Sequence, residues 1–213
     1  MRLPQPALLL VTDRRQAHLP LPGVVEASCA AGCRWVSVRE KDLPAEAQVA
    51  LAKSLLPIAR RFGARVTLHG DVELAEKAGL DGVHLSAGGD EARARALLGR
   101  ERLVGISIHE KAEAQRLDPS LVDYAIAGPA YETESKPGYG PALGPRGVAA
   151  IVAAAPVPIL AIGGIDAEKI PELMRAGAAG IAVMGSVMRS SAPGVEIERL
   201  IAALTTPASD TNP

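Results

Sequence analysis

A run of four charged residues, Arg39, Glu40, Lys41 and Asp42, directly follows a short apolar stretch that is typical of a buried strand. An arginine in such a place can bind a carboxylate or a phosphate through two parallel hydrogen bonds, and a lysine adds a compact positive charge. Arg39 and Lys41 are therefore candidates for holding an anionic substrate. The alternative is a surface loop in which the four charges only pair with one another.

Two glycine turns follow apolar runs near the end of the chain. Gly163 and Gly164 form the first turn, and Met184, Gly185 and Ser186 form the second. Glycine has no side chain, so backbone N–H groups can approach an anion closely at such turns. Two of these turns on neighbouring strands predict a phosphate-binding site. Tight turns without a ligand are the alternative.

Among the histidines, His109 is the first candidate for acid–base chemistry. It follows Ser107 at the end of an apolar run, and an imidazole can give or take a proton near neutral pH. Ser107 and His69, which ends an earlier apolar run, are expected at the same edge as substrate contacts. His84 lies inside an apolar run, so we expect a structural role in the core for it.

The longest segment without a regular pattern runs from residue 128 to residue 145. It contains Thr133, Ser135 and Lys136, whose hydroxyl and ammonium groups suit an anionic oxygen ligand. Long loops in compact domains usually cover or bind a substrate. A surface loop without a function is the alternative.

Short apolar runs alternate along the chain with amphipathic stretches, which indicates repeated strand–helix units. Within the runs, polar and apolar residues do not alternate, as is typical of parallel strands buried on both faces. The predicted strands span residues 7–11, 34–38, 65–68, 82–85, 103–108, 122–127, 157–162 and 180–184. The predicted helices span residues 23–31, 44–61, 72–78, 91–98, 110–116, 148–154, 167–176 and 196–204.

Eight such units in 213 residues favour an α/β fold, a single-domain (β/α)8 TIM barrel, over a doubly wound sheet. The domain is expected to span residues 1–213, with a polar, disordered tail at 205–213. In a barrel of this kind the active site lies on the loops that follow the strands. The candidate residues stand at or just after predicted strand ends, so the fold is expected to bring them together.

Composition excludes several other classes of protein. A net charge of -1 with one Trp, three Tyr and one Phe provides neither the basic surface nor the aromatic platforms of a nucleic-acid binder. The longest uncharged run, residues 147–165, is broken by proline and glycine, so no membrane segment is expected. Cys29 and Cys33 are too few for a zinc site or a disulfide framework, which favours a cytoplasmic location. A barrel of this size is compatible with a homo-oligomer.

These motifs together resemble those of the thiamine phosphate synthase and thiazole tautomerase superfamily. The matching segments cover nearly the whole chain, at residues 9–13, 38–42, 81–85, 104–109, 123–124, 128–129, 133–136, 161–165 and 182–186. The resemblance implies an eightfold barrel in the thiamine pathway and one of two reactions. The synthase joins a pyrimidine pyrophosphate to a thiazole phosphate and releases pyrophosphate with Mg²⁺. The tautomerase aromatises a thiazole carboxylate phosphate by moving a proton, without a metal.

Two departures from the synthase pattern affect its metal site. Where that pattern has Asn-Asp after the third strand, this chain has His69-Gly70, with Asp71 one position later. Where the pattern has Gly-Gln-x-Asp after the fourth strand, residues 86–89 read Ser-Ala-Gly-Gly and are followed by Asp90. Mg²⁺ requires oxygen ligands at short range in near-octahedral geometry. Unless Asp71 and Asp90 move into place, the resemblance therefore implies no metal cofactor for this chain.

The departures favour the tautomerase-like branch, with a small phosphorylated thiazole as the substrate. On this interpretation His109 moves the proton, Arg39 or Lys41 holds the carboxylate, and the two glycine turns hold the phosphate. The magnesium-dependent synthase is the alternative, because the segment 133–136 that would hold pyrophosphate in that enzyme is kept. A third hypothesis is a non-catalytic protein that binds thiazole or thiamine phosphates.

Overall fold

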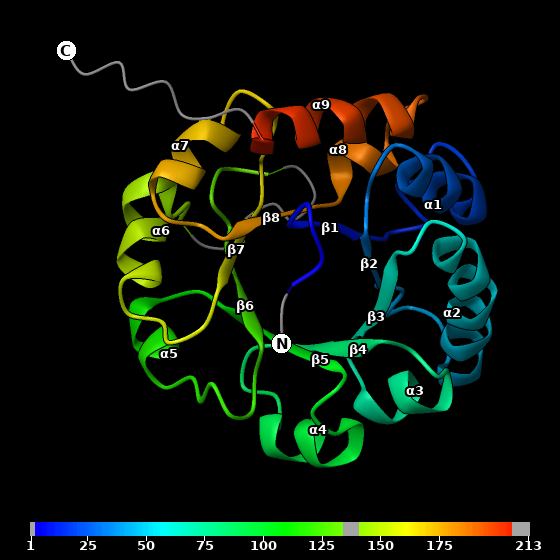
Figure 1. The fold of residues 1–213 in the computed structure, drawn as a ribbon, viewed down its shortest axis with the longest axis horizontal. Coiled ribbons are helices and arrows are strands. Elements are labelled where there is room, and N and C mark those ends of the chain that lie inside the picture. Colours follow the sequence, from blue (N-terminus) through cyan, green and yellow to red (C-terminus); the bar gives the residue numbers. More distant parts are fainter. Residues whose placement is uncertain (1–2, 134–140, 206–213) are drawn as a thin grey trace.

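Eight parallel strands follow one another around a closed barrel, and the last strand pairs with the first. The computed structural model describes residues 3–133 and 141–205 (Figure 1). The strands are β1 (Leu8–Val11), β2 (Trp35–Val38), β3 (Arg65–His69), β4 (Gly82–Leu85), β5 (Leu103–Ile108), β6 (Tyr124–Ala127), β7 (Ile159–Ile162) and β8 (Gly180–Val183). The predicted single-domain (β/α)8 TIM barrel is thus confirmed.

The helices form a ring outside the strands (Figure 1). They are α1 (Leu21–Ala30), α2 (Ala45–Arg60), α3 (Val72–Lys77), α4 (Glu91–Leu98), α5 (Lys111–Gln115), α6 (Gly144–Val152), α7 (Ile170–Arg175), α8 (Gly185–Met188) and α9 (Pro193–Thr205). Within the described residues, no helix is both long enough and apolar enough to cross a membrane.

Successive side chains of each strand face either the helices or the inside of the barrel, which explains the continuous apolar runs. In β1, Leu8 and Leu10 pack in the cluster beneath the helices, whereas Leu9 and Val11 pack in a second cluster inside the barrel. Leu3 packs against this inner cluster from the segment before β1. The barrel is therefore filled at that end, and the opposite end, where the strands finish, is where a cavity can form.

Two helices differ from the prediction in a way that matters for the site. Helix α6 begins at Gly144 rather than at residue 148, so the loop after β6 is shorter than predicted. The four-residue helix α8 directly follows β8 and was not predicted, because one turn is too short to show a helical period.

Thr205 belongs to α9 and not to the predicted disordered tail. Residues 206–213 of that tail lie outside the described part of the chain.

Candidate active site

A cavity of about 510 Å³ opens at the carboxyl ends of the strands, and we call it the mouth of the barrel. The predicted site residues that line it are Arg39, Lys41, His69, Ser107, His109, Thr133, Gly163, Gly164, Met184, Gly185 and Ser186. Closure of the barrel therefore brings together residues from both halves of the chain. Ser135 and Lys136, which were also predicted to bind substrate, lie outside the described residues.

Two cationic side chains form one wall of the mouth. Arg39 and Lys41 both line the cavity just after β2. The Lys41 ammonium donates a hydrogen bond to the Ser86 hydroxyl, 3.1 Å away, on the loop after β4. Partial burial lowers the pKa of Lys41, and the nearby charge of Arg39 lowers it further. The wall thus concentrates positive charge where an anionic group of a ligand would be stabilised.

His109 directly follows β5, and one of its ring nitrogens is hydrogen-bonded to the backbone. Its Nδ1 is 2.8 Å from the carbonyl oxygen of Gly128 at the end of β6. A carbonyl only accepts hydrogen bonds, so this contact places a proton on Nδ1, and in the neutral ring the lone pair is then on Nε2. The backbone N–H of His109 donates to the carboxylate of Glu113 in α5, which holds the histidine at the rim of the cavity.

His84 was expected to be a structural core residue, but it is both fully buried and part of the cavity lining. Its Nε2 lies 2.9 Å from the hydroxyl of Ser107. Burial, with a smaller effect from Lys41, lowers the pKa of His84 to about 3, so the ring is neutral at physiological pH. His84 therefore contacts the mouth through Ser107, and sequence reasoning missed this because its neighbours in the chain are apolar.

The ring of His84 is held from below by Tyr124, with the two ring centroids 5.6 Å apart. Gly105 lies between them in the sheet, paired with His84 on one side and with Tyr124 on the other. A side chain at Gly105 would overlap the Tyr124 ring. The glycine thus provides the space in which the tyrosine supports the histidine.

A second wall of the mouth is built from the two glycine turns, after β7 and β8. Gly163 and Gly164 have φ angles of +103° and +61°, which favour glycine, and a side chain at Gly164 would overlap the carbonyl oxygen of Glu132. In the neighbouring turn, after β8, the hydroxyl oxygen of Ser186 is buried and has no hydrogen-bond partner among the described residues. A buried polar atom of this kind costs free energy unless a ligand or a water molecule satisfies it.

Sequence reasoning missed two cations beside this wall, Lys169 and Arg189. The Lys169 ammonium donates hydrogen bonds to the carbonyl oxygen of Gly164 at 2.8 Å and to Asp166 at 2.7 Å. The Arg189 guanidinium follows α8 and donates to the side-chain oxygen of Gln16 at 2.6 Å. Both follow a glycine turn by several residues, and no local pattern marks them before the barrel is closed.

The two aspartates that a magnesium site would need point elsewhere. Asp71 caps α3 by accepting hydrogen bonds from the backbone N–H groups of Glu73 and Leu74. Asp90 caps α4 in the same way through Arg93, and neither aspartate is among the described residues that line the mouth. No group of three or more potential metal-ligating side chains occurs within the described ranges. The donor set formed by these residues does not fit Mg²⁺.

Comparisons with known proteins bear on the choice between the two reactions. A family model described as thiamine monophosphate synthase matches residues 8–187. A putative thiamine-phosphate synthase of Geobacter sulfurreducens is 40% identical over 200 residues, which cover 93% of this chain and 94% of that protein. The thiamine-phosphate synthase of Chlorobium luteolum is 33% identical, with 94% of each chain covered.

One solved structure extends this similarity to the fold. The thiamine phosphate pyrophosphorylase from Pyrococcus furiosus has a TM-score of 0.82 and 26% identity, over 92% of this chain and 94% of that chain. These names describe the synthase, which was the alternative in the sequence analysis. They do not support the narrower expectation of a tautomerase-like branch.

Proposed function

The chain belongs to the thiamine monophosphate synthase family, and from this premise we propose that it is an enzyme of thiamine biosynthesis that binds a thiazole phosphate in the mouth of its barrel. The names of its relatives support the pathway and a transferase reaction. The residues of the mouth bear on which reaction this chain performs.

The phosphate group is assigned to the wall of Gly163, Gly164, Gly185 and Ser186. The glycines of the two turns line the mouth and carry no side chain over their backbone N–H groups, and the buried hydroxyl of Ser186 needs a hydrogen-bond partner. This unsatisfied hydroxyl in the mouth is the observation that carries the phosphate assignment. The cations Arg39 and Lys41, which line the mouth after β2, are then left for a second anionic group of the same ligand.

Among the possible reactions, the geometry of the mouth supports a metal-free proton shift best. Nε2 of His109 removes a proton from the ring carbon that bears the carboxylate, the double bonds rearrange, and a proton is delivered to the exocyclic carbon. One C–H bond breaks and one forms, and the aromatic thiazole results. Arg39 or Lys41 holds the carboxylate during the step. Aromatisation supplies the driving force, so the protein supplies placement and a base.

The second candidate is the magnesium-dependent synthase reaction, and the comparisons favour it. Its support is the family match and the names of relatives that align over nearly the full chain. The positions of Asp71 and Asp90 speak against a metal site formed by those two carboxylates. A synthase built on this mouth would therefore have to hold the ion of its pyrophosphate substrate with other groups.

Two assays on the purified protein separate these candidates. The first follows aromatisation of the thiazole carboxylate phosphate tautomer with excess chelator, and the second follows pyrophosphate release from the pyrimidine pyrophosphate and the thiazole phosphate with Mg²⁺. We expect turnover in the first assay and none in the second. Magnesium-dependent pyrophosphate release would establish the synthase instead. Tight binding of the thiazole phosphate without turnover in either assay would identify a non-catalytic binder.

A further inference from the structure

Glu40 is a buried carboxylate between two cations that line the mouth. It is 2% exposed, and it is not among the described residues that line the cavity, whereas Arg39 and Lys41 on either side of it are. A carboxylate facing the mouth would repel an anionic ligand. Its orientation away from the cavity therefore needs a partner on the other side, and the loop after β1 provides it.

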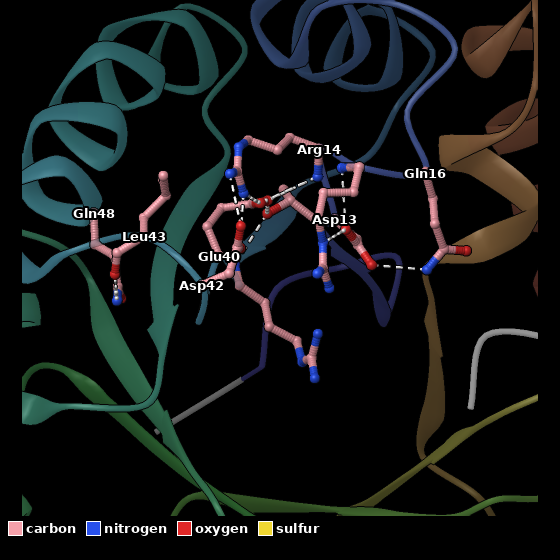
Figure 2. A network of polar contacts seen from close by, with 10 residues as sticks. Asp13, Arg14, Gln16, Glu40, Asp42, Leu43 and Gln48 are labelled. Carbon is pink, nitrogen blue, oxygen red and sulfur yellow. Dashed lines mark hydrogen bonds and ion pairs between the residues drawn. The ribbon is translucent and has the colours of Figure 1, made fainter. Parts of the chain in front are cut away.

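Three groups of that loop donate hydrogen bonds to Glu40 (Figure 2). The hydroxyl of Thr12 donates to Oε1 at 2.7 Å, and the backbone N–H of Arg14 donates to both carboxylate oxygens at 3.1 Å. The Arg14 guanidinium donates to Oε2 at 3.1 Å and also binds both oxygens of Asp42 at 2.7 Å. Arg14 thus compensates both acidic side chains of the charged run.

Thr12 connects this carboxylate to Arg39. A carboxylate can only accept, so the hydrogen of the buried Thr12 hydroxyl is committed to Glu40. The same oxygen then accepts the backbone N–H of Arg39 at 2.9 Å. The direction of the Thr12 hydroxyl therefore depends on the charge and position of Glu40. The position of the Arg39 backbone depends in turn on this hydroxyl.

We propose that Glu40 is a positioning residue that, through the hydroxyl of Thr12, fixes Arg39 toward the anionic group of the ligand that lies opposite the phosphate. The inference rests on the proposed function, because it requires Arg39 to contact that anionic group. Glu40 itself does not line the cavity, and its positioning role is distinct from the ligand contacts proposed for Arg39 and Lys41.

The test compares two ligands by calorimetry, so that it does not depend on turnover. The ligands are the aromatic thiazole phosphate with and without its carboxylate, and the ratio of their dissociation constants reports the contact with Arg39. We expect Glu40→Gln to reduce this preference for the carboxylated ligand by about tenfold, as expected for coupled neighbours in one hydrogen-bond network. Thr12→Val, which removes only the connecting hydroxyl, is expected to act in the same direction.

A double-mutant cycle with Arg39→Ala distinguishes positioning from general destabilisation. In the Arg39→Ala background, Glu40→Gln is expected to change the preference no further. The inference would be overturned if Glu40→Gln reduced the preference for the carboxylated ligand equally with and without Arg39→Ala. It would also be overturned if Glu40→Gln and Thr12→Val left the preference unchanged. If Arg39→Ala itself leaves the preference intact, Arg39 does not contact the carboxylate and this role of Glu40 is overturned, whereas failure of the unchanged protein to bind the thiazole phosphate would contradict the proposed function. Glu26→Gln, which breaks the exposed ion pair with Arg61, is the matched control and is expected to bind as the unchanged protein does.

Discussion

His84 and His109 both line the mouth of the barrel and differ in the groups that surround them. His109 is partly exposed, and the carbonyl of Gly128 fixes its tautomer, so that Nε2 carries the basic lone pair. His84 is fully buried, packs against the rings of Tyr124 and His69, and lines the mouth beside Ser107. At the scale of single residues, these surroundings suit His109 to the proposed proton transfer and keep His84 neutral.

The neutral state of His84 predicts a pH dependence of stability. Its pKa is about 3 in the folded protein against 6.5 for an ordinary histidine, so between these values the unfolded chain binds the extra proton and acid favours unfolding. Folding stability is expected to fall by about 1 kcal/mol from roughly pH 6.5 to pH 5.5, and further below. Urea unfolding at several pH values measures this, and His84→Gln should flatten the dependence.

If the free energy of unfolding depends on pH with the same slope in the unchanged protein and in His84→Gln, the pKa of His84 does not differ between the folded and unfolded states.

At the scale of elements, the starts of α3 and α4 explain why two aspartates are unavailable to a metal. Asp71→Asn and Asp90→Asn should keep both helix caps, since asparagine caps as well as aspartate, whereas the alanine variants should each lose about 0.5–2 kcal/mol of unfolding free energy. We expect aromatising activity to be retained in the asparagine variants. Loss of activity in a variant that unfolds like the unchanged protein would assign that aspartate to the active site.

The glycine turn after β7 gives a second prediction at this scale. In Gly164→Ala the new methyl group would overlap the carbonyl of Glu132 at a φ of +61°, so the turn must move. We expect a loss of roughly 1–3 kcal/mol in stability together with a raised KM for the thiazole phosphate. Gly79→Ala is the control, because Gly79 has a φ of +65° with open space around it and is not among the described residues that line the mouth. It should lose stability through backbone strain alone, with KM unchanged.

At the scale of the whole molecule, closure of the barrel decides which features could be predicted from the sequence. The strand positions were predictable because each strand is a continuous apolar run, and the site residues at strand ends followed from the fold. Arg189 could not be predicted, because its place in the mouth depends on α8 and on Gln16 from the far end of the chain. The roles of Asp71 and Asp90 as helix N-caps could not be predicted either. Each aspartate stands one position later than in the synthase pattern, and the sequence does not show whether such a carboxylate binds a metal ion or caps a helix.

The central claim is that this mouth moves a proton by means of His109 without a metal ion. The measurement that tests it most directly is the rate of aromatisation of the thiazole carboxylate phosphate tautomer, with excess chelator, for the unchanged protein and for His109→Gln. We predict that chelator leaves the rate of the unchanged protein intact and that His109→Gln loses at least about 100-fold, the usual contribution of a general base. A rate that disappears with chelator, or one that survives His109→Gln, would contradict the claim.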